Sequence, residues 1–127
     1  KRPVYFIDIN FEFLSEIYAS NSMKYIKVPK FPQIKRDLSL LIDNNILYRD
    51  IYDFIKINST HLLVNVSLFD VYEGEKLEKG KKSYAISFIF QDSQATLTDQ
   101  KIDNEMISIY RKLQKEFSLS LRDGELG

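Results

Sequence analysis

Two strands joined by a charged loop, together spanning residues 61–91, constrain the fold of this chain more than any other feature. Residues 83–91 alternate without a break between large apolar side chains and smaller ones. The large side chains that share one face are Tyr84, Ile86, Phe88 and Phe90. A period of two with one apolar face is typical of a half-buried antiparallel strand, so this strand belongs to a sheet with one covered and one open face.

The alternation in the preceding strand, residues 61–72, is imperfect. In a regular strand the apolar Val66 would share a face with Asp70 and Tyr72, which would direct a carboxylate toward the core. One extra residue in a strand reverses the parity of every side chain that follows. We therefore expect a β-bulge near Ser67, which would remove the conflict.

The remaining elements follow from the strand period of two and from the helical period of about 3.6 residues. Strands are expected at 4–10, 34–43 and 118–122, and helices at 11–18, at 48–58 and from Thr98, its N-cap, to about residue 117. Two prolines predict an extended lead-in at 24–32. From residue 34 the order is strand, helix, strand, strand, helix, strand. This order predicts an α+β fold of the ferredoxin-like split βαβ type (βαββαβ), a four-stranded antiparallel sheet with two helices on one face.

The composition argues against several classes of function. The chain has no cysteine and only one histidine, His61, among 127 residues. Disulfides and thiol nucleophiles are excluded, and neither a histidine-based metal site nor a Ser-His-Asp triad is expected. No buried pair of acids and no glycine-rich phosphate loop is recognisable. No apolar run reaches the roughly 18 residues of a membrane span, and no secretory signal opens the chain. We therefore expect a non-catalytic domain without a membrane partner.

Polar side chains gather where the two central strands meet their loop. Asp70 and Tyr72 end the first strand, and Ser83 begins the second. A carboxylate can accept hydrogen bonds from the Watson–Crick edge of guanine, and a tyrosine ring can stack on an unpaired base. Lys81 and Lys82 are placed to meet phosphate. Two simpler interpretations stay open, because polar residues often end a strand and loop lysines are usually solvated.

Two arginines complete the set of candidates. Arg36 lies near the start of strand 34–43, and Arg122 closes the last strand. Arginine planes stack on bases, whereas a surface ion pair with Asp37 or Asp123 is the more common role. Basic and acidic residues balance at 18 each, which argues mildly against a free-standing nucleic-acid binder. Local patches matter more than the total charge, so the balance does not exclude RNA binding.

Four strings occur together in one known family. They are FPQIKRDLSLLID (31–43), LFDVYEGEKLEKGKKSYAISFIFQD (68–92), TLTDQKID (96–103) and LSLR (119–122). In this order and at this spacing they resemble the C-terminal anticodon-binding domain of the bacterial phenylalanyl-tRNA synthetase beta chain. VYFIDINFEFL resembles the end of the segment that precedes this domain. The resemblance implies two parts, a lead-in at 1–30 and a ferredoxin-fold anticodon-binding domain at 31–127.

The resemblance also implies a function. The domain would bind the anticodon stem-loop of tRNA(Phe) in the cytoplasm and support aminoacylation. Its partners would be the rest of the beta chain and the alpha chain, in a heterotetramer of two alpha and two beta chains. The parent enzyme uses ATP and magnesium, and no cofactor is implied for this domain. Carried over residue by residue, the family's RNA contacts fall on Asp70, Tyr72, Ser83 and Arg122, and Arg36 matches the arginine of the RDL string.

The expected mode of recognition differs from a standard RNA-recognition motif. Such motifs place aromatic side chains on the open faces of two central strands, whereas the corresponding positions here carry small residues. The chain should therefore read one or two bases at the strand ends and the loop. Alone, it should bind tRNA weakly, because most affinity would come from the rest of the enzyme engaging the same tRNA.

Two alternatives and one further expectation remain. A ferredoxin-like domain can also hold a small regulatory ligand, or dock another protein on its open sheet. The strand expected at 4–10 would leave an unpaired apolar edge if its normal neighbour were missing. Such an edge should pack back on the domain or cause self-association between copies.

Overall fold

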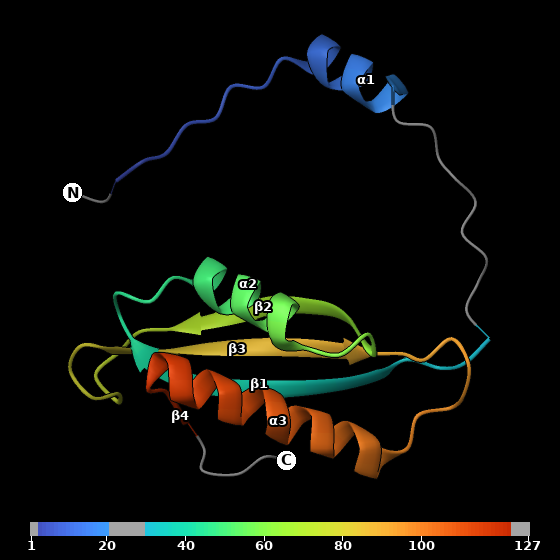
Figure 1. Cartoon of the computed structure of the whole chain (residues 1–127). Coiled ribbons are helices and arrows are strands. Elements are labelled where there is room, and N and C mark those ends of the chain that lie inside the picture. The colour runs from blue at the N-terminus through green and yellow to red at the C-terminus, as the bar shows by residue number, and fades with distance from the viewer. Residues whose placement is uncertain (1–2, 21–29, 123–127) are drawn as a thin grey trace.

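The computed structural model describes residues 3–20 and 30–122 of the chain, and Figure 1 shows their arrangement. One sheet contains β1 (Ile34–Asp43), β2 (Leu63–Tyr72), β3 (Lys81–Phe90) and β4 (Ser120–Leu121), in the spatial order β2-β3-β1-β4. All neighbouring strands are antiparallel. Helices α2 (Tyr48–Asn58) and α3 (Asp99–Phe117) lie on the same face of this sheet (Figure 1). The predicted α+β architecture is confirmed, and the order of its elements is consistent with a ferredoxin-like fold.

The hydrophobic core lies between the sheet and these two helices. The large residues of the alternating strand β3 point into it, and Ile86, Phe88 and Phe90 are fully buried. The helical residues that meet them are Ile51 and Ile55 of α2 and Ile102, Met106, Ile109 and Leu113 of α3. Burying a side chain of this size stabilises the fold by about 1.5–3 kcal/mol, so the apolar face of β3 fixes which side of the sheet the helices cover.

The N-terminal part differs from the prediction. A short helix is present as expected, α1 (Phe11–Ser20). The strand predicted at 4–10 is wrong, because residues 3–10 adopt neither helix nor strand. Phe6 is 88% exposed, and no described strand pairs with this segment, so its backbone has no ladder to join. Because no strand forms here, the reason for expecting self-association through an unpaired strand edge does not apply. The lead-in predicted at 24–32 lies mostly outside the described residues.

Strand β2 contains two register shifts, one at its start and one between Leu68 and Asp70. The bulge predicted near Ser67 is confirmed, two positions further along the strand, because Ser67 itself pairs regularly with β3 and the shift follows Leu68. The extra residue at the second shift is Phe69. Beyond it, Asp70 and Tyr72 fall on the face of the sheet that the helices do not cover, because parity is reset by one position.

The C-terminal strand is shorter than the predicted range 118–122. Helix α3 begins as expected, with the Thr98 side chain accepting a hydrogen bond from the Lys101 backbone N–H at 3.4 Å. It ends at Ser118, whose φ of 51° is in the left-handed region. This residue turns the chain back toward the sheet, so only Ser120–Leu121 pair with β1 as a strand.

Candidate nucleic-acid interface

We call the face of the sheet opposite α2 and α3 the open face. Its small side chains form the floor of the surface: Ser39 from β1, Ser67 from β2, and Ser83, Ala85 and Ser87 from β3. They follow from the alternation of β3, since each residue between two large core residues must point the other way. The floor is therefore low enough for larger side chains from neighbouring strands to lie across it.

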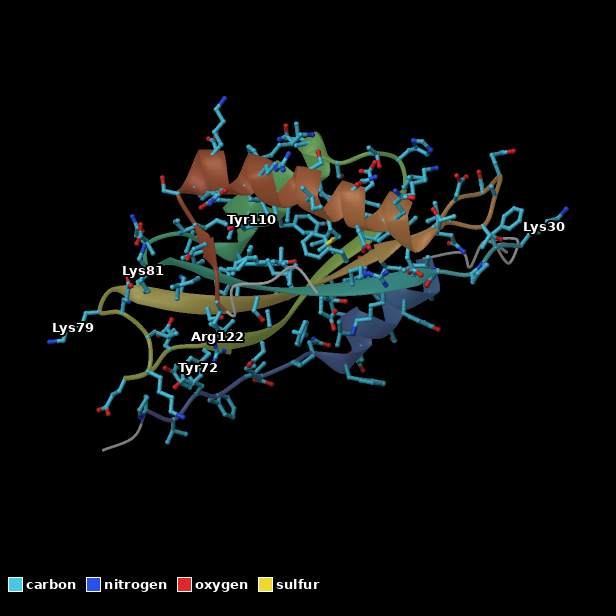
Figure 2. The ribbon with its side chains drawn as sticks, turned by 90° about the horizontal axis from the view of Figure 1, so that it is seen from below. Lys30, Tyr72, Lys79, Lys81, Tyr110 and Arg122 are labelled. Carbon is cyan, nitrogen blue, oxygen red and sulfur yellow. The ribbon has the colours of Figure 1, made fainter. Side chains whose placement is uncertain are left out.

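Tyr72 and Arg122 meet on this face. Tyr72 is opposite Ser83, and the backbone N–H of Arg122 donates to the Ser39 carbonyl at 3.0 Å. The guanidinium carbon of Arg122 lies 4.8 Å from the centre of the Tyr72 ring. Figure 2 shows both residues on the side of the sheet away from Tyr110 of α3. Tyr72 on β2 and Arg122 after β4 come from opposite edges of the sheet, so their side chains meet above the two central strands. Ser83 of β3 lies opposite Tyr72 and is only 2% exposed.

Gly74 supports the position of the Tyr72 ring. A Cβ at Gly74 would lie 2.7 Å from the hydroxyl oxygen and 2.9 Å from Cζ of Tyr72, closer than a side chain can approach. Among the described glycines, only Gly80 has a positive φ, of 83°. Gly74 is therefore needed for close approach and not for backbone conformation. Spacing alone could not reveal this role.

Asp70 lies next to this pair on the same strand. It is exposed and sits opposite Ala85, which has no side chain large enough to cover it. None of the described residues forms an ion pair or a hydrogen bond with its carboxylate. The group can therefore accept two hydrogen bonds from a ligand without breaking an internal contact.

Arg36 is not part of this group. It is in phase with the core residues of β1 and lies on the helix-covered face, where its guanidinium contacts Asp99 at 2.6 Å and Asp103 at 3.5 Å. Of the two ion-pair partners considered from the sequence, Asp37 pairs with Lys35 instead, at 3.2 Å, and Asp123 lies outside the described residues. The hydrogen bond to Asp99 raises the pKa of Arg36 above its ordinary value. These contacts tie β1 to the start of α3.

Lys82 also lies on the helix-covered face. It is 6% exposed, its ammonium donates to the Asn44 carbonyl at 2.8 Å, and it lies 4.9 Å from the centre of the Tyr84 ring. The alternation of β3 contained this signal, since Lys82 is in phase with Tyr84. Lys81 forms an ion pair with Asp43 at 2.7 Å. The structure thus brings together Asp70, Tyr72, Ser83 and Arg122, and it separates Arg36 and Lys82 from them.

The chemistry that this surface offers is recognition. An aromatic ring, a guanidinium plane, a carboxylate and a buried hydroxyl can stack on a flat ligand and hydrogen-bond its edge. Within residues 3–20 and 30–122, no group of three or more histidine, aspartate or glutamate side chains is placed to hold a metal ion. None of the described helices combines the length and the apolarity that a membrane span requires.

The fold and this surface together define an α+β domain of ferredoxin-like order that presents a polar, aromatic recognition site on its open face. Comparison with protein families matches residues 29–122 to the ferredoxin-fold anticodon binding domain. The chain belongs to this family.

Individual relatives agree with that assignment. The chain is 42% identical over 119 residues to the phenylalanine–tRNA ligase beta subunit of Bacteroides fragilis, covering 94% of the chain and 14% of that protein. Identity to the same subunit of Porphyromonas gingivalis is 37% over 122 residues, or 96% of the chain and 15% of that protein. For Clostridium tetani it is 36% over 118 residues, or 93% and 15%. The chain therefore spans only a small part of the length of these relatives.

Proposed function

We propose that this domain binds the anticodon stem-loop of tRNA(Phe) as part of a phenylalanine–tRNA ligase beta subunit. The observation that carries the proposal is the convergence of Asp70, Tyr72, Ser83 and Arg122 on one patch of the open face. These residues come from two strands and from the position directly after a third, and only the fold brings them together. Their chemistry suits an unpaired base, which offers a face for stacking and an edge for hydrogen bonding.

In the proposed mode, a base of the loop stacks on the Tyr72 ring. Arg122 already lies against this ring, 4.8 Å from its centre, so a base takes the place of the guanidinium or stacks with it. The carboxylate of Asp70 accepts hydrogen bonds from the edge of that base. An arginine displaced from the ring is free to meet the RNA phosphates.

The proposed role is non-catalytic. The parent enzyme would provide the catalytic site, in its alpha chain, together with ATP and magnesium, and this domain would need no cofactor of its own. It would work in the cytoplasm within a heterotetramer of two alpha and two beta chains. Alone, the domain should bind weakly and with salt dependence, because phosphate contacts release counterions. Within the enzyme, the other tRNA contacts raise the effective concentration of the anticodon loop at this surface.

Substitution of Asp70 in the complete ligase tests the proposal. We predict that Asp70→Ala raises the KM for tRNA(Phe) strongly and leaves the KM for phenylalanine nearly unchanged. The direction is informative, because removing a carboxylate that merely repels phosphate would improve binding. Asp53→Ala, which removes an exposed acid from α2 on the covered side, is the matched control. An equal effect on both substrates, or a lower KM for tRNA, would contradict the role of Asp70.

The small-ligand and protein-docking alternatives make different predictions. A domain that holds a free amino acid should be stabilised by it in a thermal-shift screen. A domain that only docks protein should show no chemical-shift change at residues 70–83 when RNA is added.

A further inference from the structure

We infer that the open face contains a second base-stacking position, formed by Phe69 and Lys35, for another nucleotide of the same single-stranded RNA. This inference rests on the proposed function and extends it. It adds a subsite that the sequence analysis did not include, since small residues were expected over most of the open face.

The first observation is an exposed aromatic ring with a cation beside it. Phe69 is 58% exposed, although a phenylalanine in a strand normally packs in the core. The ammonium of Lys35 lies 5.6 Å from the centre of its ring. Lys35 is on β1 opposite Ile89, so its side chain crosses β3 to reach a residue of β2. The contact therefore lies on the open face.

The register shift explains why Phe69 points this way. Leu68 is opposite Ile86 on the covered face, and Asp70 is opposite Ala85 on the open face, with Phe69 as the unpaired residue between them. In a regular strand, two consecutive residues cannot share a face. The bulge allows Phe69 to join Asp70 on the open face.

The floor beside this ring contains an unused hydrogen-bonding group. Ser87 is 4% exposed, and its hydroxyl has no hydrogen-bond partner among the described residues. The register sets it between Asp37 of β1 and Ser67 of β2 on the open face. Buried hydroxyls are normally paired. Because less than 1 Å² of this oxygen is accessible, a ligand on the open face can reach it only if the side chains above it move aside.

The arrangement repeats that of the Tyr72–Arg122 pair. In both, an aromatic ring comes from β2 and a cation reaches it from the other side of β3. Phe69 and Tyr72 are separated by two to three positions along the strand, or about 7–10 Å. This is within the reach of one or two splayed-out nucleotides. Between the pairs lie the small side chain of Ala85 and the exposed Asp70, whose carboxylate can accept hydrogen bonds from a base edge, so a single strand that crosses both pairs passes over both residues.

RNA accounts for this second pair better than a protein partner does. A docking protein would favour a wider apolar patch, whereas here each ring is accompanied by a cation. Arg122 pairs with no described carboxylate, and Lys35 pairs with Asp37 at 3.2 Å. A surface ion pair of this kind is weak, so Lys35 can exchange it for a phosphate. Stacking on an aromatic ring tolerates any base, because every base has a π-face. The second position should therefore add affinity without adding much sequence preference.

The test combines a protein variant with an altered RNA. The 127-residue chain is titrated with an RNA hairpin carrying the anticodon loop of a phenylalanine tRNA. Matched hairpins carry an abasic ribose at one loop position at a time. We expect Phe69→Ala to weaken binding of the intact hairpin about five-fold or more, the loss typical of one stacked base. At the loop position whose base stacks on Phe69, combining the abasic ribose with Phe69→Ala should reduce affinity no more than either change alone. The same non-additivity with Tyr72→Ala should occur at a different loop position.

Phe69→Trp, which keeps a stacking ring, should retain binding. Val64→Ala is the matched control, because it also truncates an exposed apolar residue of β2. Unchanged thermal unfolding of each variant shows that the fold is intact. If Tyr72→Ala weakens binding while Phe69→Ala does not, or if the two variants couple to the same nucleotide, the second position is refuted and the proposed function stands. If the unaltered chain does not bind the hairpin even at millimolar concentration, the proposed function fails and this inference fails with it.

Discussion

The two faces of the sheet hold their arginines in different ways. On the covered face, Arg36 is held by two carboxylates of α3, and the ammonium of Lys82 is held by a backbone carbonyl. On the open face, Arg122 lies against the Tyr72 ring and pairs with no described carboxylate, whereas Lys35 lies against the Phe69 ring and also pairs with Asp37 at 3.2 Å. Carboxylates and carbonyls fix the direction of a donor, whereas a ring attracts a cation without directed hydrogen bonds.

This difference separates structural cations from those available to a ligand. A base has a flat π-face like that of a tyrosine ring, so a guanidinium on the open face can exchange one stacking partner for another. A donor held by carboxylates would first have to break charge-assisted hydrogen bonds. Residue type alone does not distinguish the two situations, since Arg36 and Arg122 are both arginines and only Arg36 is held by carboxylates of the described residues.

The largest expected contrast is between two phenylalanines. Phe88→Ala should destabilise the domain by about 3–5 kcal/mol, because it empties a fully buried position of the core. Phe69→Ala should change the free energy of unfolding by less than about 0.5 kcal/mol, because its ring is exposed. Urea denaturation of both variants measures this contrast. A large loss of stability in Phe69→Ala would mean that the open face has a packing role.

The two arginines provide the next contrast. Arg122→Ala should weaken RNA binding about 3- to 30-fold, the range for losing a cation beside a stacked ring, without lowering stability. Arg36→Ala should lower stability by at most about 1 kcal/mol, because solvent screens its partners, Asp99 being 80% and Asp103 53% exposed. RNA titration and thermal unfolding of both variants measure these effects. An equal loss of RNA affinity in both variants would mean that Arg36 also contacts RNA, which would contradict the contrast between the two faces.

The smallest contrast concerns two glycines. Gly74→Ala should weaken RNA binding about two- to five-fold, because the new Cβ moves the Tyr72 ring away from its rotamer minimum. In a Tyr72→Ala background the same substitution should have no effect on binding. Gly80→Ala should instead lower stability by about 1 kcal/mol, because its φ of 83° strains any other residue. Affinity and unfolding measurements on the three variants test this. Loss of stability without loss of affinity in Gly74→Ala would refute the support of Tyr72.

Much of the fold could be predicted from periodicity. The boundaries of α2 are as predicted, and the large residues of β3 occupy the core. The strand expected at 4–10 failed because apolar composition does not supply a neighbouring strand. The length of β4 was overestimated because Ser118 adopts a left-handed conformation that serine rarely shows.

The candidate site was less accessible to sequence reasoning. The parity conflict in β2 indicated a bulge but not its position, since any residue between Val66 and Asp70 could have relieved it. The position decides whether Phe69 points into the core or out of it. The partners of Arg36 lie on a helix more than sixty residues further along the chain, so the nearby Asp37 was the natural and incorrect choice.

The bulge at Phe69 reverses, for the rest of β2, which residues face the helices and which face away. Upstream of it, even-numbered residues such as Val66 and Leu68 face the helices. Downstream, the even-numbered Asp70 and Tyr72 face away from them. Deleting Phe69 would leave the residues on either side of it paired with β3 and would remove only the bulge residue. Replacing it changes one exposed ring and no pairing. A substitution at position 69 can therefore change the ligand-facing surface without changing the packing of the core.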